Sequence, residues 1–418
     1  MLNKDIFCNI PWVEVHINAD GTYHSCGAQP NTISNTPAGI TNNVHQMTIP
    51  EWINSEHQRR ARKNKLEGVE EPLCGMCYAE DASGSSSKRV KENLKSSISD
   101  LTFYKDYPTS PDFNMFEFSR ADGSTDNLRP YSYHISLGNE CNLACKMCGP
   151  TASSRLAVQM IQDGSYTGPA RMNWTTNESS WNHVVDYICS TDNLRFVHII
   201  GGEPLMNPKF EDLIDRLISA GKTDIYLGFT TNGTMVNIPL IKKLNVFRHV
   251  DIGISIEAAG ALNNAIRDGS TTETVLDNID IYLKYRREAH VYVTLRAVPS
   301  ALSVHTLDEL YHWCISRRLD VVTNMLTFPE YQQIRNLPDL VKQRLLDQYG
   351  QWEYSEPLPG TSDPRDPNRF REHIDSEIRA IINCLQQPAD PVLTAELYRK
   401  LTAWGWLDDP NLKKYFEI

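Results

Sequence analysis

The sequence lacks any long apolar run. Across its 418 residues no segment approaches the roughly 18 uninterrupted apolar residues that a membrane helix needs. Residues 1–20 contain the acidic residue Asp5 and no continuous apolar core, so they do not have the pattern of a secretory signal peptide. We therefore expect a protein that stays in the cytoplasm and has no membrane partner.

Basic residues are also fewer than acidic residues. There are 41 Lys and Arg residues against 52 Asp and Glu residues, which gives a formal net charge of −11. A chain with this balance is repelled by phosphate backbones and by anionic membrane surfaces. We therefore expect no nucleic-acid partner. The share of hydrophobic residues, 40%, is that of a globular protein.

Cysteine is infrequent, but its distribution is uneven. Only ten cysteines occur, and in a reducing compartment such residues serve as metal ligands or redox groups more often than in disulfides. Seven of them form two groups, and the other three stand alone as Cys189, Cys314 and Cys384. The two groups are Cys8, Cys26, Cys74 and Cys77, then Cys141, Cys145 and Cys148.

Short β-rich runs alternate with helical patterns from about residue 130. One intervening helix is expected over 208–221, where Phe210, Leu213, Ile214, Leu217 and Ile218 share one apolar face. Strands that alternate with helices favour an α/β fold with a mainly parallel sheet, and six such units predict a partial barrel. The six expected strands are 132–137, 194–200, 224–230, 249–256, 290–298 and 319–326.

The two ends of the chain have different patterns. Residues 12–26 suggest a hairpin that turns at Asn18–Gly21, and a helix is expected over 49–68. Its basic run 57–65 favours a solvated helix face over a docking patch for an acidic partner. Beyond about residue 338 we expect mostly helices, interrupted by a loop at 356–369.

The three cysteines in CNLACKMCGP have the spacing C-x3-C-x2-C and directly follow the first strand of the repeating region. Ligands of parallel α/β folds sit beyond the carboxyl ends of the strands. A structural zinc site takes four ligands, whereas a [4Fe–4S] cluster held by three thiolates keeps one iron open for another molecule. A zinc loop remains the alternative at this point.

This spacing resembles the signature of the radical S-adenosylmethionine (radical SAM) enzymes, in which Met147 stands at a position that prefers an apolar or aromatic side chain. The next strand ends in Gly201, Gly202, Glu203 and Pro204, which resembles the family's GGEP motif. Two glycines let a backbone approach a ligand closely, and a carboxylate suits an ammonium group. The resemblance implies that GGEP meets the amino group of the cofactor's methionine.

Later strand ends resemble further cofactor-binding segments of the family. They contribute Thr231 and Asn232, then Ser255, then Arg267, and finally Arg296, which could pair with the methionine carboxylate. The resemblance implies that one electron from the cluster cleaves S-adenosylmethionine (SAM). The resulting 5′-deoxyadenosyl radical abstracts hydrogen from a substrate C–H bond, while the protein orients the reactants. Glu257 stands where many relatives have Asp, so its role is open.

The four cysteines of the first group suit a fully ligated cluster. Their pattern, C-x12-G-x4-C followed later by C-x2-C, resembles the opening of the SPASM and twitch extensions that bind auxiliary [4Fe–4S] clusters. No cysteine lies between Cys77 and Cys141, so a twitch (half-SPASM) domain with one auxiliary cluster is expected. A structural zinc site with the same four ligands is the alternative.

The resemblance thus predicts a partial (β/α)6 radical SAM barrel with a small N-terminal Cys-rich α+β twitch domain and C-terminal helices. The expected parts are a twitch domain over 1–95, a linker over 96–130, the barrel over 131–330 and a helical region over 331–418.

The expected function is modification of a peptide or protein, with a reductant such as flavodoxin or ferredoxin as partner. The absence of a leader-peptide-binding segment before the twitch region counts against a ribosomal peptide. A small-molecule dehydrogenase or epimerase of the same superfamily is the main alternative. A non-catalytic zinc or iron–sulfur scaffold is another, although a scaffold would need neither GGEP nor an open three-cysteine site.

Overall fold

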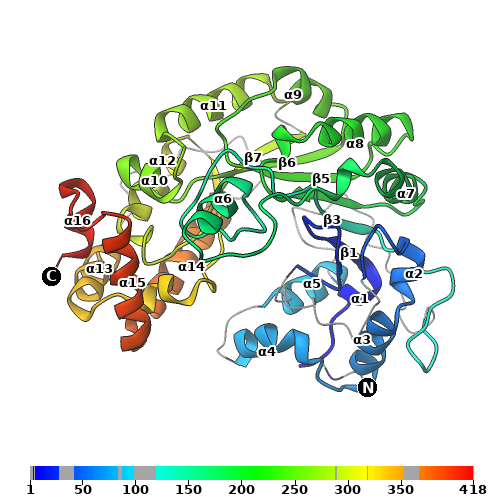
Figure 1. The fold of residues 1–418 in the computed structure, drawn as a ribbon, viewed down its shortest axis with the longest axis horizontal. Helices are drawn as coiled ribbons and strands as arrows, with labels where there is room; N and C mark the ends of the chain where they lie inside the picture. The colour runs from blue at the N-terminus through cyan, green and yellow to red at the C-terminus, as the bar shows by residue number, and fades with distance from the viewer. Residues whose placement is uncertain are drawn as a thin grey trace. The chain divides into compact units, whose positions relative to one another are not determined.

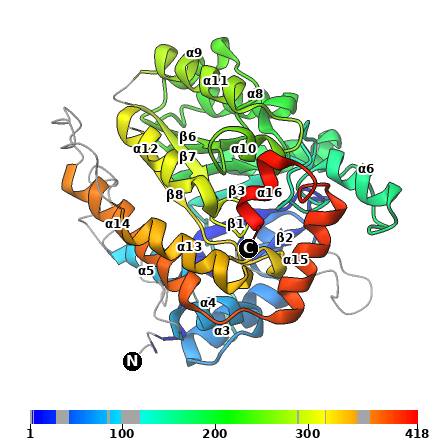
Figure 2. The same ribbon diagram turned by 90° about the vertical axis from the view of Figure 1, so that its left-hand side faces the viewer.

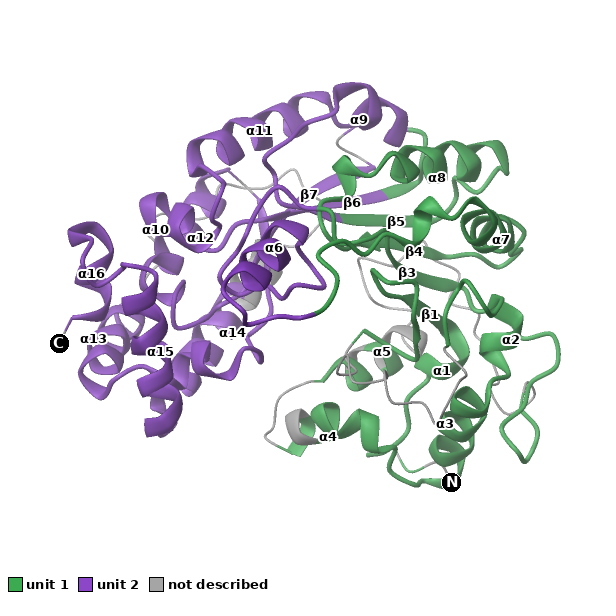
Figure 3. Cartoon of the chain, in the orientation of Figure 1, with its two compact units in different colours: residues 1–140, 168–229, 246–249 green, residues 141–167, 230–245, 250–418 purple. Residues whose placement is uncertain are grey.

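The computed structural model describes residues 3, 5–27, 42–82, 87–97, 119–287, 290–317, 319–352 and 367–417. The fold is mixed α/β with parallel strands (Figure 1). The chain divides into two compact units that interleave along the sequence (Figure 3). Unit 1 comprises residues 1–140, 168–229 and 246–249, and unit 2 comprises 141–167, 230–245 and 250–418.

Unit 1 contains strands in the order β2-β1-β3-β4-β5. Strands β1 and β2 form an antiparallel hairpin, while β1 pairs in parallel with β3, β3 with β4, and β4 with β5. The register aligns His16 with His134, and His134 with His198. The strands are β1 (Glu14–Ile17), β2 (Tyr23–His24), β3 (Ser132–Ser136), β4 (Phe196–Ile200) and β5 (Tyr226–Thr231), and the last two residues of β5 belong to unit 2.

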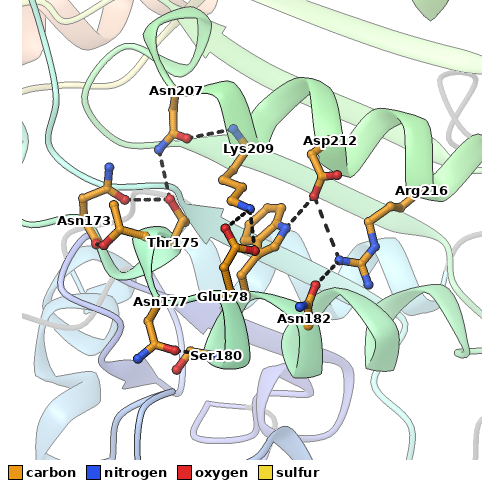
Figure 4. A network of polar contacts seen from close by, with 12 residues as sticks. Asn173, Thr175, Asn177, Glu178, Ser180, Asn182, Asn207, Lys209, Asp212 and Arg216 are labelled. Atoms are coloured by element: carbon orange, nitrogen blue, oxygen red, sulfur yellow. Dashed lines mark hydrogen bonds and ion pairs between the residues drawn. The ribbon is translucent and has the colours of Figure 1, made fainter.

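The helices of unit 1 fall into an N-terminal set and a later pair, α7 and α8, which lie side by side (Figure 1). Trp181 of α7 donates a hydrogen bond to Asp212 of α8 at 2.6 Å, within the polar network of Figure 4. The helices are α1 (Ile10–Val13), α2 (Ile49–Ile53), α3 (Glu56–Glu67), η2 (Pro72–Cys74), α4 (Gly75–Ala82), α5 (Lys88–Ser97), η3 (Trp174–Thr176), α7 (Glu178–Cys189), η4 (Pro204–Met206) and α8 (Pro208–Ser219).

Unit 2 contains the parallel strands β6-β7-β8 in that order. Its C-terminal helices α13 to α16 gather near the end of the chain (Figure 2). The elements are α6 (Ser154–Gln162), α9 (Ile238–Leu244), β6 (His249–Ser255, whose first residue belongs to unit 1), α10 (Gly260–Ile266), α11 (Thr272–Tyr285), β7 (Val291–Ala297), η5 (Val304–Thr306), α12 (Leu307–Arg317), β8 (Asp320–Thr323), η6 (Glu330–Gln332), η7 (Ile334–Asn336), α13 (Asp339–Gly350), α14 (Pro367–Gln386), α15 (Pro391–Ala403) and α16 (Pro410–Phe416).

All six expected strands are confirmed within about three residues at each end, and so is the hairpin. The expected face of α8 is buried at Phe210, Leu213, Ile214 and Leu217, whereas Ile218 is only half-buried. The sequence did not indicate that β1 joins the parallel strands beside β3. Closure into a partial barrel and the division into four parts stay predictions. Residues 356–366 of the expected loop and residues 98–118 of the expected linker 96–130 lie outside the described residues, whereas residues 367–369 begin α14.

The single helix expected over 49–68 is wrong, because it breaks at Asn54 and Ser55 into α2 and α3. The solvated face expected for residues 57–65 is also wrong in part. Arg62 is fully buried and donates to the carbonyl oxygens of Gly123, Pro11 and Ile53. Lys65 is buried as well and donates to the Tyr78 hydroxyl at 2.6 Å.

Within the described residues, no helix combines the length and the apolar character that crossing a lipid bilayer requires. All ten cysteines lie among the described residues, and none of them forms a disulfide.

Candidate functional site

The three-cysteine loop belongs to unit 2 and begins soon after β3 along the chain. The hydroxyl of Ser154 accepts a hydrogen bond from the Cys141 backbone N–H at 3.2 Å. Ser153 caps α6 and donates to the Leu143 carbonyl oxygen at 2.5 Å. The Cys148 N–H closes a turn onto the Cys145 carbonyl oxygen. The loop is therefore fixed by the start of α6.

A second contact holds the same loop against the segment that follows α10. The N–H groups of Ala144 and Lys146 donate to the carbonyl oxygens of Asp268 and Ile266, each at 2.9 Å. The Lys146 ammonium also lies 3.3 Å from the Asp268 carboxylate. These two backbone bonds bracket Cys145 on one side and Arg267 on the other.

The thiols of Cys145 and Cys148 interact directly. A hydrogen bond between them lowers the pKa of Cys145 to about 7, with the positive charge of Arg267 acting in the same direction against the effect of burial. The same bond, together with burial, raises the pKa of Cys148 well above its usual value. One thiolate is therefore favoured near neutral pH, and thiolates are the form that binds metal.

Arg267 and Glu257 form a buried ion pair beside these thiols. The guanidinium Nη1 lies 2.7 Å from Glu257 Oε1, and Glu257 Oε2 accepts from the Val298 N–H at 2.7 Å. Burial opposes the charge of Arg267, but Cys145, Glu257 and Cys148 together raise its pKa. Sequence reasoning assigned Arg267 to cofactor binding and left Glu257 open. The geometry makes Glu257 the residue that fixes Arg267.

Asn232 lies against the first cysteine of the loop. Its Nδ2 is 3.8 Å from the Cys141 sulfur and donates to Asn142 Oδ1 at 2.8 Å. The neighbouring Thr231 is buried, and its hydroxyl accepts from the Gly233 N–H. Of the two residues predicted at this strand end, Asn232 is thus in contact with a cysteine, whereas Thr231 shapes the turn.

The GGEP motif belongs to unit 1, where it follows β4. Both glycines have positive φ, and a Cβ on Gly202 would lie 2.1 Å from the Glu140 carbonyl oxygen. That oxygen accepts the Glu203 N–H at 2.7 Å. The Glu203 side chain is buried and caps the short helix that Pro204 begins. The motif therefore packs against the residue that precedes Cys141 in the chain.

The remaining predicted residues lie in unit 2. Arg296 on β7 is paired in register with Ser255 on β6, and its guanidinium forms an ion pair with Asp251. Asp251 also accepts from the Thr294 hydroxyl at 2.8 Å. Arg296 thus already has a carboxylate partner, which the sequence did not indicate. Met147 is half-buried within the cysteine loop.

The four cysteines of the first group line one pocket of unit 1. Cys8, Cys26 and Cys77 are buried, and Cys74 is half-buried. The other residues that line this pocket are Ile10, Leu73, Lys88 and Arg89. The four cysteines, which are far apart in the sequence, thus lie around one pocket. What the sequence did not indicate is that α5 adds two cations.

These cations, together with Lys65, lie close to the thiols of the pocket. Burial raises the pKa of Cys8 and of Cys74 above the usual value, and Lys65 offsets only part of this increase. Lys88 donates to the buried carboxylate of Glu14 at 3.0 Å. Positive groups around four converging thiols stabilise thiolates, and thiolates are soft ligands suited to iron–sulfur clusters or zinc.

A row of histidines on neighbouring strands was missed by sequence reasoning. His16, His134 and His198 stand in register on β1, β3 and β4, with ring centroids 6.1 and 5.5 Å apart. Glu14 lies 3.2 Å from His134 Nε2. Although burial opposes it, the charges of His134 and Lys88 hold the Glu14 pKa well below its usual value. No signal could have found this row, because its members lie more than 60 residues apart.

Among the described residues, no three His, Cys, Asp or Glu side chains could together hold a single metal ion. The ligands of an iron–sulfur cluster stand further apart than those of one ion, since each cysteine binds a different iron. The donor atoms of each cysteine group are cysteine sulfurs, and each group has a buried or partly buried cation beside it. These residues therefore fit thiolate-ligated clusters chemically.

Residues 135–319 match the family model described as the radical SAM superfamily. This chain carries a radical SAM domain. The domain extends from β3 through α12 and contains the three-cysteine loop, GGEP and the Arg267–Glu257 pair. Members of the radical SAM superfamily are enzymes, and the family implies a [4Fe–4S] cluster and SAM as cofactors.

Curated relatives of this radical SAM domain differ in what they do. The S-adenosylmethionine-dependent nucleotide dehydratase of Selenomonas ruminantium is 19% identical over 214 residues, which are 49% of this chain and 65% of the relative. The mycofactocin maturase MftC of Mycobacterium tuberculosis is 28% identical over 130 residues, which are 30% of this chain and 28% of the relative. The chain therefore spans less than two thirds of these relatives.

Among solved structures, Streptococcus suis SuiB bound to its precursor peptide SuiA is 14% identical with a TM-score of 0.34. The match covers 84% of this chain and 69% of SuiB.

Proposed function

We propose that this protein is a radical SAM enzyme that abstracts a hydrogen atom from a C–H bond of a peptide or protein. The loop with Cys141, Cys145 and Cys148 is the observation that carries the proposal. The loop is fixed by backbone contacts, and the buried cation Arg267 favours the ionised form of Cys145. These residues would hold the catalytic [4Fe–4S] cluster and leave one iron for SAM.

The cluster and SAM supply the radical chemistry, and the residues of this chain bind and orient them. Gly201 and Gly202 would bring the backbone close to the methionine moiety of SAM. The Glu203 carboxylate would accept hydrogen bonds from the ammonium group of that methionine. We propose the other predicted residues as further cofactor contacts. They are Met147, Pro204, Thr231, Asn232, Ser255, Arg267 and Arg296.

We also propose that Cys8, Cys26, Cys74 and Cys77 hold an auxiliary [4Fe–4S] cluster, as a twitch domain does. The pocket supports this by adding Lys88 and Arg89, which offset the negative charge of a four-thiolate cluster. The cluster would transfer electrons or help to hold substrate. A structural zinc site is the competing assignment, and it would carry no electrons.

The peptide is the first substrate class to test, because the first cysteine group resembles that of relatives that modify ribosomally made peptides. The small-molecule alternative is favoured by one curated relative, which is described as a nucleotide dehydratase. A small reductant protein such as flavodoxin or ferredoxin would deliver the electron. We place the protein in the cytoplasm, since ten cysteines without a disulfide suit a reducing compartment.

The deciding experiment counts metals on anaerobically reconstituted protein and measures dithionite-driven formation of 5′-deoxyadenosine from SAM. We expect about eight irons per chain, with about four left after Cys141, Cys145 and Cys148 are all replaced by Ala. SAM cleavage should disappear in that variant. Replacing Cys74 and Cys77 by Ala should remove the other four irons and leave the cleavage of SAM detectable.

Each other result excludes a specific assignment. About four irons that fall to none in the triple variant would exclude the auxiliary cluster. Zinc in place of iron at the first group would establish the structural site instead. Protein that takes up zinc alone and does not cleave SAM would exclude the enzyme and leave the scaffold.

A further inference from the structure

We propose that the Arg267–Glu257 pair sets the reduction potential of the cluster that Cys145 and Cys148 would hold. In this assignment Arg267 makes the cluster easier to reduce, and Glu257 limits that effect. The inference rests on the proposed function, since it requires a cluster at this loop. It assigns Arg267 an electrostatic role that does not depend on contact with SAM.

The position of Arg267 is fixed by backbone rather than by its own flexible side chain. The bonds from Ala144 and Lys146 to Asp268 and Ile266 hold residue 267 directly opposite Cys145. The Arg267 N–H also donates to the Asn263 carbonyl oxygen at the end of α10. Loop and cation are therefore parts of one rigid contact within unit 2.

The guanidinium is in turn held by a single buried carboxylate. Glu257 is 2% exposed and is fixed by three bonds, to Arg267 Nη1, to the Val298 N–H and from its own N–H to Asn263 Oδ1. Arg267 itself is 7% exposed. Its Nε has no hydrogen-bond partner within the part of the chain that the structure describes. The pair is thus rigid and shielded from water.

Burial makes these charges effective at the cluster. Water screens exposed charges strongly, whereas charges in a protein interior act with a much smaller effective dielectric constant. Reduction adds one negative charge to a cluster. A fixed cation stabilises the reduced form more than the oxidised form and so raises the potential, while a fixed carboxylate lowers it. The two residues should therefore act in opposite directions.

A second carboxylate near the loop provides a matched control. Asp268 contacts Lys146 at 3.3 Å and Arg155 at 3.4 Å, but its side chain is 34% exposed. Its backbone carbonyl oxygen, which bonds to Ala144, is unaffected by a change of side chain. Asp268→Asn thus removes a negative charge from the same neighbourhood without disturbing the backbone contact, and solvent screens that charge.

The test is a spectroelectrochemical titration of the full-length reconstituted protein in the absence of SAM. The signal of the catalytic cluster is the one that is missing from the Cys141, Cys145 and Cys148 triple variant. We expect Arg267→Gln to shift its midpoint potential to more negative values and Glu257→Gln to shift it to more positive values. Asp268→Asn should shift it less than either, and Arg267→Lys should stay near the wild-type value.

The two variants exclude a merely structural role, because loosening of the loop would move both potentials in the same direction. The inference would be overturned if the midpoint potentials of Arg267→Gln and Glu257→Gln shifted equally. It would also be overturned if neither potential shifted while both variants kept their full iron content. If Arg267→Gln fails to retain iron, Glu257→Gln decides alone, and a zero or negative shift overturns the inference. Wild-type protein without iron at this loop would instead overturn the proposed function. Weaker SAM binding by Arg267→Gln at an unchanged potential would make Arg267 a cofactor ligand only.

Discussion

At the scale of single residues, the glycines of GGEP are needed for the protein's own packing. A Cβ on Gly201 would lie 1.7 Å from the Ser136 hydroxyl oxygen, and one on Gly202 would meet the Glu140 carbonyl oxygen. Both have positive φ, which side chains disfavour. These glycines therefore let the end of β4 pack against the backbone that leads into Cys141, whatever ligand they also meet.

Replacing Gly202 by Ala should destabilise the protein by roughly 3 kcal/mol or more, because strain at φ +54° adds to the clash with Glu140. Gly164 is a matched control, since its φ is +77° and no atom would contact its Cβ within 4 Å. Gly164→Ala should therefore cost only about 1 kcal/mol. Urea unfolding measures both, and equal losses would show that the clash is relieved by movement of the Glu140 backbone.

Some of the site residues could be predicted from the sequence, and others could not. The three-cysteine loop and GGEP are recognisable because each lies within one short segment. Glu257 has no such signal, since its role depends on a contact with Arg267 that folding creates. The same holds for His134 and Glu14, which lie on different strands. Side-chain pairs between elements follow from strand order, and that order cannot be read from the sequence.

At the scale of elements, the residue that caps α8 also binds a distant segment of the chain. Asn207 accepts from the Lys209 N–H, and its Nδ2 donates to the Thr175 hydroxyl at 3.3 Å (Figure 4). The same Nδ2 also donates to the Leu137 carbonyl oxygen at 3.0 Å. Asn177 caps α7 in the same figure with one bond, from the Ser180 N–H. Asn177 thus makes a hydrogen bond only within its own helix, whereas Asn207 also connects α8 to Leu137 and Thr175.

The two caps allow a direct comparison. Asn177→Ala should lower the free energy of unfolding by about 1 kcal/mol, the usual effect of losing an N-cap. Asn207→Ala should cost roughly 2–3 kcal/mol, because it also leaves the buried Leu137 carbonyl oxygen without its amide partner. Denaturant unfolding of the two variants measures the difference. Equal costs would mean that the link between α8 and Leu137 adds nothing to stability.

The basic run of α3 explains why one kind of sequence prediction failed. Charged residues are mostly solvated, so residues 57–65 favoured an exposed face. Arg62 is nevertheless buried, because three backbone carbonyl oxygens from separate segments accept its protons. The pattern of charges along one helix does not contain this information. It depends on Pro11, Ile53 and Gly123 meeting in space.

At the scale of the whole molecule, the sequence predicted the elements better than their grouping. Each strand is a short β-rich run, and such runs are visible without any knowledge of their neighbours. The two compact units, in contrast, are built from interleaved segments, and the chain passes between them within β5. Boundaries of this kind depend on contacts between distant residues, which composition does not record.

Stability should fall on acidification, because both units bury neutral histidines. Burial lowers the pKa of His16 in unit 1 and of His305 in unit 2 from 6.5 to about 3. Between pH 6.5 and about pH 3, each of these histidines is protonated in the unfolded chain but not in the native state. The free energy of unfolding therefore falls as the pH drops below about 6.5. One such histidine costs up to about 2 kcal/mol at pH 5.

His305→Gln should reduce this loss, since the substituted side chain does not titrate. Urea midpoints at pH 7.5 and pH 5 measure the effect for the wild type and the variant. The half-buried His312 on α12 is the control, and His312→Gln should lose as much stability as the wild type does. A His305→Gln variant that is equally acid-sensitive would contradict the expectation.

The parallel pairing of β1 with β3 has a consequence for how the protein is made. Glu14–Ile17 find their partner strand only after about a hundred further residues have been synthesised. At about 5–20 residues per second, that interval lasts on the order of ten seconds. Throughout it, Cys8 and Cys26 flank a β1–β2 hairpin whose parallel neighbour β3 has not yet been made. Until β3 is made, metal delivered to Cys8 and Cys26 would therefore meet a sheet that still lacks the parallel partner of β1.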